Sequence, residues 1–215
     1  MKVFLLGSTG RLGNEILKRL IGNKIETNIL VRNREKIKIK SKYLEIFIGD
    51  PLDKKKLEIA ILNCKIVITT LNISRKSDFP WSKLRAPKTL LSETVSNLVH
   101  LHQKYNFDKI ISISAWGVKE SKNQLPFWFR WLIDSSNIRY GYLDHEKQED
   151  ILTNSNCNWM IVRPVGLSKS QKDVKPEISI NSKPCNLMVS RKTVSKFIID
   201  NLNNKSLTNQ IVTIS

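Results

Sequence analysis

The chain contains 215 residues, of which 36 are lysine or arginine and 19 aspartate or glutamate, so its formal net charge is +17. Its hydrophobic fraction of 40% and charged fraction of 26% are close to globular averages, which excludes general disorder. No apolar run approaches the ~18 residues of a membrane-spanning helix, and the N-terminus lacks the cleavage site of a signal peptide. The length predicts one domain, 1–215.

Positive charge is spread along the whole chain, and the densest basic run, Arg32–Lys42, is interleaved with isoleucine. Such a balance favours anionic partners, although a solvated lysine-rich surface, produced by the bias of an AT-rich genome, is the simpler interpretation. Cys64, Cys157 and Cys185 show no metal-ligand spacing and predict neither disulfides nor a metal site. We therefore expect a reducing, cytoplasmic environment.

Short apolar runs alternate along the chain with segments whose apolar residues recur at helical spacing. The predicted strands lie at 3–6, 27–31, 44–48, 65–71, 110–114, 159–162 and 210–214. The predicted helices lie at 12–20, 53–62, 87–105, 141–153 and 191–202. This alternation predicts an α/β Rossmann fold, a doubly wound parallel sheet with helices on both faces and a small C-terminal substrate-side segment.

Two irregular stretches, 119–139 and 167–189, each follow a predicted strand in the second half of the chain. Ligands of open parallel sheets bind at the carboxyl ends of the strands. We therefore expect these stretches to form loops or a lid over a substrate.

The strongest local motif is the glycine turn GSTGRLG at 7–13, which follows the first strand and opens the first helix. In that context the first glycine allows the tight turn, the second lets a pyrophosphate approach the backbone, and the third lets helix and strand pack closely. The free N–H groups and the helix dipole then favour phosphate. The motif predicts dinucleotide binding, with a purely structural glycine turn as the alternative.

The end of the second predicted strand indicates which cofactor is preferred. NAD sites usually place a carboxylate there, whereas an arginine suits the 2′-phosphate of NADP. Here Arg32 follows the strand, and Glu35 lies too far into the loop. The sequence therefore favours NADP(H) over NAD(H), unless Arg32 is only a surface arginine.

A series of motifs in this order resembles a known family. They are GSTGRLG at 7–13, ILVRNREKI at 29–37, FIGDPLD at 47–53, KIVITTLN at 65–72, FDKIISISAWGV at 107–118, LDHEKQEDIL at 143–152, NWMIVRPVGL at 158–167 and VSRKTVSKFII at 189–199. The chain resembles the atypical short-chain dehydrogenase/reductases with an NAD(P)H-binding, NmrA-like domain. Within them it is most similar to the flavin reductase and biliverdin-IXβ reductase branch.

The resemblance implies roles for residues at the matching positions. The implied cofactor-binding residues are Gly7, Ser8, Thr9, Gly10, Arg11, Leu12 and Gly13 at the pyrophosphate, Arg32 at the 2′-phosphate, Asp50 and Pro51 at the adenine, Thr70 and Leu71 at the nicotinamide ribose, Ser114 and Ala115 at the nicotinamide, and Pro164 and Val165 at its carboxamide. Individually, some have simpler interpretations: Asp50 as a turn residue, and Pro164 as a strand terminator.

Many relatives carry a Tyr-x-x-x-Lys pair that relays a proton, and this chain departs from that pattern. Alignment on Glu149 and the downstream Ser155 puts His145 at the lysine position and Gly141 at the tyrosine position. This resembles the branch in which hydride passes directly to an electron-poor planar acceptor. Ser114 and His145 are then the candidate catalytic residues, with Tyr140 or Tyr142 as donors from shifted positions. A plain helix-surface histidine remains the alternative for His145.

The segment 125–132, LPFWFRWL, concentrates aromatic residues around Arg130. Aromatic faces suit a flavin or tetrapyrrole, and an arginine suits its phosphate or propionate, so Trp116, Trp128 and Arg130 are candidate substrate residues. The alternative is a short amphipathic helix packed on the core or on another subunit. Base stacking lacks interleaved basic residues here, so we do not expect specific nucleic-acid binding.

The leading hypothesis is an NADPH-dependent oxidoreductase that transfers hydride to a flavin, quinone or tetrapyrrole, acting as a monomer or homodimer on a small-molecule acceptor. The alternative is a non-catalytic NADP(H)-binding redox sensor or assembly factor that acts through a protein partner. A third possibility, an epimerase-like enzyme, is disfavoured because the part after Val165 is too short for a separate sugar-nucleotide domain.

Overall fold

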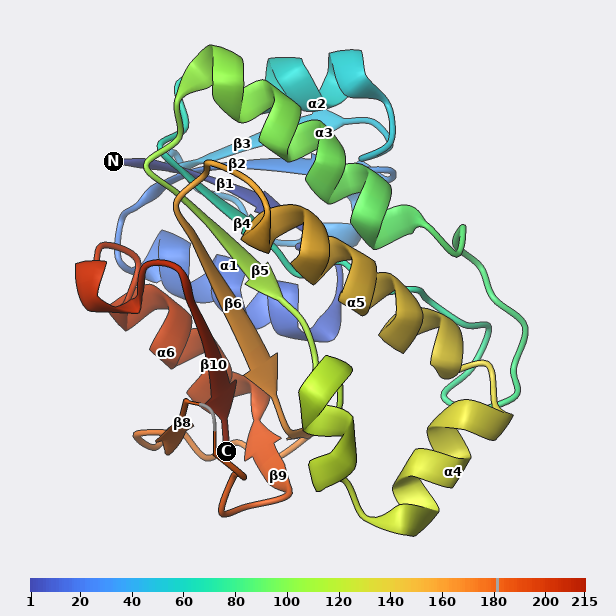
Figure 1. The fold of residues 1–215 in the computed structure, drawn as a ribbon. Coiled ribbons are helices and arrows are strands. Elements are labelled where there is room, and N and C mark those ends of the chain that lie inside the picture. Colours follow the sequence, from blue (N-terminus) through green and yellow to red (C-terminus); the bar gives the residue numbers. More distant parts are fainter. Residues whose placement is uncertain (181) are drawn as a thin grey trace.

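The computed structural model describes residues 1–180 and 182–215. An eight-stranded sheet with the order β3-β2-β1-β4-β5-β6-β10-β8 forms its centre (Figure 1). All neighbouring strands run parallel except the edge strand β8, which is antiparallel to β10. The strands are β1 (Lys2–Leu6), β2 (Glu26–Val31), β3 (Leu44–Ile48), β4 (Ile66–Thr69), β5 (Lys109–Ile113), β6 (Trp159–Pro164), β8 (Ile178–Ser179) and β10 (Gln210–Ile214).

Helices connect the strands, and a small second sheet pairs β7 (Gly166–Ser168) with β9 (Met188–Ser190). The α-helices are α1 (Arg11–Gly22), α2 (Lys54–Ile61), α3 (Leu90–Tyr105), α4 (Phe127–Ser135), α5 (Arg139–Thr153) and α6 (Arg191–Asp200). Short 3₁₀ helices are η1 (Arg34–Lys36), η2 (Lys119–Gln124) and η3 (Lys205–Leu207).

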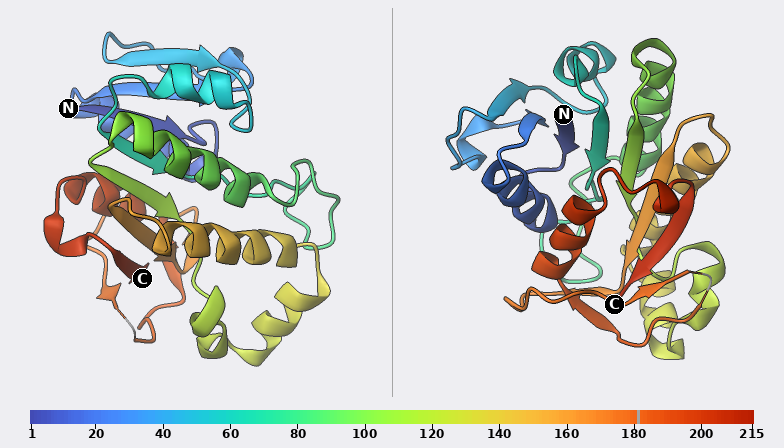
Figure 2. Two further views of the ribbon diagram at one scale, coloured as in Figure 1. Left: turned by 45° about the horizontal axis from the view of Figure 1, so that its top comes forward. Right: turned by 90° about the vertical axis from the view of Figure 1, so that its left-hand side faces the viewer.

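The sheet separates two hydrophobic layers, because side chains alternate between its faces. On β1, Val3 and Leu5 point toward the layer that contains α1 and α6, which lie side by side (Figure 2). Phe4 and Leu6 point toward the layer of α2 and α3, and α5 packs beside α3 (Figure 1). The central strands are therefore buried on both faces, which explains their continuous apolar sequences.

The predicted α/β Rossmann fold is confirmed. The predicted strands and helices occur with end shifts of a few residues, and the largest shift is at α3, which begins at Leu90 instead of residue 87. Its first turn is capped from another helix, since Asp144 of α5 accepts bonds from Leu91 N at 2.7 Å and Ser92 N at 3.3 Å. A cap from a distant segment leaves no local sequence signal.

The stretches predicted to be irregular contain more order than expected. Residues 119–139 form η2 and α4, and residues 167–189 include β8 and parts of β7 and β9. The thiols of Cys64, Cys157 and Cys185 are unbridged. Within the described ranges, no helix is both long and apolar enough to cross a bilayer.

Candidate functional site

The turn between β1 and α1 is tightly constrained at its glycines. Gly7 has φ +81°, a left-handed conformation that favours glycine. A Cβ atom on Gly13 would lie 2.1 Å from the carbonyl oxygen of Gly7, so only glycine lets the helix approach the strand this closely. The Gly10 amide donates to the Gly7 carbonyl at 2.8 Å and closes the turn.

The N-terminus of α1 is free to receive an anion. Its N-cap residue, Gly10, offers no side-chain acceptor, and the first turn contains no acidic residue. The first N–H groups of a helix lack internal partners and carry partial positive charge, which favours phosphate. The hydroxyl of Ser8 is buried beside this turn and has no hydrogen-bond partner among the described residues. The turn therefore fits a pyrophosphate group.

The carboxyl ends of β4, β5 and β6 continue the same edge of the sheet. After β4, the Thr70 hydroxyl donates to the Leu6 carbonyl at 2.9 Å, which holds this residue against the end of β1. After β5, the Ser114 amide donates to Val162 at 2.8 Å. The Ser114 hydroxyl is buried without a partner within the described ranges, so it is available to a ligand.

After β6, Val165 donates its amide to Ile214 at 3.0 Å, and Pro164 accepts a bond from the Trp116 amide at 3.1 Å. The structure thus brings the predicted glycine-turn, ribose, nicotinamide and carboxamide residues to one edge of neighbouring strands. Their contact with a cofactor stays a prediction.

Arg32 and Asp50 lie after β2 and β3. Arg32 is exposed and forms no ion pair among the described residues, so its guanidinium can meet a phosphate. Asp50 is exposed, and its carboxylate accepts a bond from the Leu52 amide at 2.9 Å, which shows that it also stabilises a turn. The neighbouring Pro51 is buried.

His145 lies in the interior, where α5 meets β5. It is 4% exposed, and burial lowers its pKa to about 4. Its Nδ1 lies 2.9 Å from the Gln148 side-chain nitrogen, which also donates to the Ile113 carbonyl at 3.0 Å. Because an amide nitrogen only donates, Nδ1 accepts this bond and the proton resides on Nε2. His145 is therefore a neutral imidazole near pH 7.

The two tyrosines on either side of Gly141 have different surroundings. The Tyr140 hydroxyl accepts a bond from Arg139 at 2.9 Å, and Lys88 Nζ lies 4.0 Å from its ring centroid. The hydrogen bonds with Arg139 and Lys88 lower the pKa of Tyr140. The Tyr142 hydroxyl donates to the Trp116 carbonyl at 3.3 Å, and burial raises its pKa to about 12. Tyr140 is the better proton donor of the pair.

Gly141, which the sequence resemblance aligns with the tyrosine position, lies close to the loop after β4. A Cβ atom there would lie 3.3 Å from the Asn72 side-chain oxygen, which is a tight contact. Asn72 follows β4, so Gly141 lies beside the strand ends that carry Thr70 and Leu71.

The three predicted substrate residues differ in accessibility. Trp116 is 4% exposed and donates its indole N–H to Gln124 at 3.0 Å, so it packs inside the molecule. Trp128 is exposed on α4, and Arg130 is half-buried with its Nε unpartnered within the described part of the chain. The structure does not gather these three side chains into one wall, and their substrate roles stay predictions.

A buried ion pair behind the site was not predicted. Arg163 of β6 and Glu149 of α5 are 2% and 0% exposed, and two bonds of 2.9 and 2.6 Å join them. Glu120 of η2 also pairs with Arg163. Burial opposes the charge of Arg163, but the hydrogen bonds that Arg163 donates to Glu149 and Glu120 outweigh this effect and raise its pKa. This pair connects β6 to α5 and η2, directly before Pro164.

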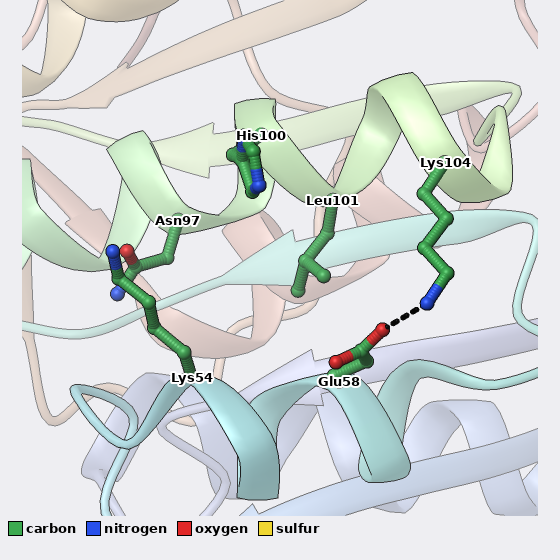
Figure 3. Close-up of a pocket in the computed structure, with 6 residues that line it drawn as sticks. All are labelled: Lys54, Glu58, Asn97, His100, Leu101 and Lys104. Atoms are coloured by element: carbon green, nitrogen blue, oxygen red, sulfur yellow. Dashed lines mark hydrogen bonds and ion pairs between the residues drawn. The ribbon is translucent and has the colours of Figure 1, made fainter.

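A shallow depression of about 260 Å³ lies elsewhere, between α2 and α3 (Figure 3). Its lining residues are Lys54, Glu58, Asn97, His100, Leu101 and Lys104. Lys104 and Glu58 close it with a 2.7 Å ion pair. It contains none of the predicted site residues. Among the described residues, no cluster of histidine, cysteine or carboxylate side chains could hold a metal ion.

This sheet order, with a glycine turn between β1 and an uncapped α1, defines a Rossmann dinucleotide-binding protein. The comparison with protein families agrees, since a profile described as NAD(P)H-binding matches residues 7–205. The chain therefore belongs to the NAD(P)H-binding family, as the sequence resemblance implied, and its place in the flavin reductase and biliverdin-IXβ reductase branch stays a prediction. No curated protein sequence matches the chain.

Solved structures share the fold over the whole chain. A short-chain dehydrogenase/reductase from Veillonella parvula, in complex with NADP, is 18% identical with a TM-score of 0.78, covering 100% of this chain and 94% of that one. ChuY, an anaerobilin reductase from Escherichia coli O157:H7, is 17% identical with a TM-score of 0.80, covering 100% and 96%. The oxidoreductase ylbE from Lactococcus lactis is 16% identical with a TM-score of 0.80, covering 100% and 90%.

Proposed function

We propose that this protein is an NADPH-dependent reductase that transfers hydride to a planar acceptor such as a flavin, quinone or tetrapyrrole. The observation that carries the proposal is the uncapped N-terminus of α1 at a glycine turn, on the same edge as the unpartnered hydroxyl of Ser114. Two structural neighbours support it, because one is named as an anaerobilin reductase and another contains NADP.

In this proposal the glycine turn at 7–13 and Ser8 hold the pyrophosphate, and Arg32 holds the 2′-phosphate. Ser114 and Ala115 position the nicotinamide, and Pro164 and Val165 close against its carboxamide. The bound nicotinamide supplies the hydride. The protein contributes orientation and exclusion of water.

The proton that accompanies the hydride needs a donor other than Tyr-x-x-x-Lys. His145 is a weak donor, because its imidazole is neutral and its Nδ1 is occupied by Gln148. Ser114 offers a free hydroxyl next to the proposed nicotinamide position, and Tyr140 offers a phenol of lowered pKa next to Gly141. An electron-poor acceptor such as a flavin also accepts a proton from solvent, so hydride transfer does not depend on one side chain.

Two further assignments accompany the proposal. Residues 1–215 form a single NAD(P)-binding domain, with 119–139 and 167–189 on the acceptor side of the strand edge. The three unbridged thiols fit a reducing compartment, and we assign the protein to the cytoplasm.

The test measures NADPH oxidation as the loss of NADPH absorbance. FMN, a soluble quinone and biliverdin are supplied as separate acceptors. We expect acceptor-dependent turnover with at least one of them, faster with NADPH than with NADH. A Gly10→Val variant provides the control, because its side chain would block the phosphate position. Equal oxidation by the wild type and this variant would contradict the proposal.

A second function is a redox sensor or assembly factor that binds NADP(H) without turnover. The absence of a Tyr-x-x-x-Lys pair on α5 favours it, since Tyr140 and Tyr142 are followed four residues later by Asp144 and Glu146. Cofactor binding with no oxidation for any of the three acceptors would favour the sensor. Tight NADP(H) binding that changes capture of a protein partner would support it directly.

A further inference from the structure

Helix α4 projects away from the sheet (Figures 1 and 2). Five large aromatic side chains are exposed on this helix and on the loop after β4, which is joined to it. We call them the aromatic corner. Its members and their exposed fractions are Phe79 62%, Trp81 43%, Phe127 76%, Trp128 64% and Trp131 59%. Contiguous exposed apolar surface of this kind marks an interaction site.

Three of the five residues share one face of α4. Trp131 lies four residues after Phe127 and three after Trp128, a spacing that places all three together on a helix. The opposite face supplies Ile133, which is 2% exposed and packs into the core together with Phe129. The helix is therefore apolar on both faces, and packing within this chain explains only one of them.

The other two residues lie at the tip of a hairpin-like loop that follows β4. An antiparallel bridge joins Arg75 to Leu84, and the Lys76 amide donates to the Lys83 carbonyl at 2.9 Å. The chain reverses between them and presents Phe79 and Trp81, whose rings are 5.3 Å apart. Lys76 and Lys83 thus face each other at the base of a loop whose tip carries two aromatic residues.

Hydrogen bonds join this loop to the end of α4, which brings its two aromatic residues next to the helix that carries the other three. The Trp81 indole donates to the Ser135 carbonyl at 2.9 Å. The Asn137 amide donates to Pro80 at 3.1 Å, and its side chain donates to the Trp81 carbonyl at 2.9 Å.

The charges around the aromatic corner are unbalanced toward positive. Its neighbouring acidic residues, Asp78, Glu120 and Asp134, all form ion pairs, with Arg11, Arg163 and Lys122. In contrast, Lys76, Lys83 and Arg85 are exposed and form no ion pair among the described residues. Free cations therefore border exposed tryptophan and phenylalanine.

We propose that the aromatic corner docks the protein on an anionic membrane surface. Tryptophan and phenylalanine insert at the boundary between headgroups and acyl chains, and the lysines and Arg85 meet lipid phosphates. A second copy of the chain fits this surface less well, because a symmetric contact would place the unpaired cations Lys76, Lys83 and Arg85 of both copies beside one another.

The test is binding of the full chain to lipid vesicles, measured by co-sedimentation and by tryptophan fluorescence. Vesicles of phosphatidylcholine alone are compared with vesicles that contain about one third phosphatidylglycerol. We expect binding to the anionic vesicles, a blue shift of the emission, and weakening with added salt. Absence of binding to the anionic vesicles would overturn the proposal.

Two double variants assign the binding to this surface. Trp128→Ser with Trp131→Ser, and Lys76→Glu with Lys83→Glu, should each weaken partition into anionic vesicles by about tenfold or more. Lys24→Glu with Lys205→Glu is the matched control, since it makes the same charge change at exposed lysines before β2 and β10, at the opposite strand edge. Equal weakening by the control would reduce the effect to net charge and overturn the docking surface.

Self-association is measured on the same samples by analytical ultracentrifugation. A dimer that the tryptophan variants abolish, without vesicle binding by the wild type, would assign the surface to a second copy and overturn the proposal. Circular dichroism confirms that each variant is folded, and the lysine variant tests the surface even if the tryptophan variant does not fold. The inference does not depend on the proposed reductase activity.

Discussion

The carboxyl ends of the parallel strands form one edge of the sheet, and the two halves of this edge differ in whether backbone or side chains form their surface. Around β1 and α1 the surface consists of backbone, with glycines in close contact and helix N–H groups free of side-chain caps. Beyond β5 and β6 it depends on side chains, namely the buried pair Arg163–Glu149, the neutral His145 and the aromatic segment of α4. A backbone-built site needs particular residues at particular positions, whereas a side-chain-built site allows many solutions.

The largest expected effect tests the side-chain half. Glu149→Leu removes the buried partner of Arg163 and leaves only the exposed Glu120, and breaking a buried pair costs about 3–5 kcal/mol. Denaturant unfolding should show a loss of this size. Asp200→Asn breaks the exposed pair with Lys196 and should cost about 1 kcal/mol or less. Similar small losses for both variants would show that the buried pair is not a structural connection.

The corresponding test of the backbone half is Gly13→Ala. The added methyl group would lie 2.1 Å from the Gly7 carbonyl oxygen, so the turn must open, and we expect a loss of about 3 kcal/mol or more. Gly22→Ala is the control, because nothing lies within 4 Å of its Cβ position. If the two variants unfold at the same denaturant concentration, that result would contradict the close packing of α1 against β1 at Gly13.

The third prediction uses the burial of His145. Its folded pKa is about 4, below the value of about 6.5 for an unfolded histidine. Burial favours the neutral imidazole in the folded state. The folded protein therefore has its full stability above pH 6.5 and loses stability as the pH falls toward 4. The loss reaches up to about 3 kcal/mol.

The free energy of unfolding should therefore fall more steeply with decreasing pH for the wild type than for His145→Gln, which has no imidazole to protonate. Identical pH profiles for the two proteins would contradict a buried neutral histidine.

The smallest effect separates cofactor preference from cofactor binding. Arg32→Ala should weaken NADPH binding by about 1.5–3 kcal/mol, the contribution of a hydrogen bond to a charged group, and leave NADH nearly unchanged. Arg34→Ala, two residues further along, is the control for lost surface charge. Fluorescence titration of the two cofactors measures the effect, and equal weakening of NADPH and NADH would refute the assignment to the 2′-phosphate.

The sequence predicted best what is encoded locally. Each central strand is apolar on both faces, and Gly7, Gly10 and Gly13 occupy positions where spacing alone implies a turn. Residues 119–139 were predicted to be irregular, with a short amphipathic helix as one interpretation of 125–132. Helix α4 forms there, with one apolar face in the core and the other exposed.

Interactions between distant segments could not be predicted. Asp144 of α5 caps the N-terminus of α3, and Glu149 of α5 pairs with Arg163 of β6. Both acids lie within the helical segment predicted at 141–153, where they resemble ordinary surface carboxylates. Only their burial distinguishes them, and burial depends on how α5 packs against α3 and β6.

The most direct test of the nucleotide site is a titration of the wild type and Gly10→Val with NADPH and NADH, monitored by nicotinamide fluorescence. We expect saturable binding by the wild type, tighter for NADPH than for NADH, and no measurable binding of either cofactor by a folded Gly10→Val variant. Unchanged binding by that variant would place the cofactor elsewhere and contradict the assignment of the strand edge at β1 as the nucleotide site.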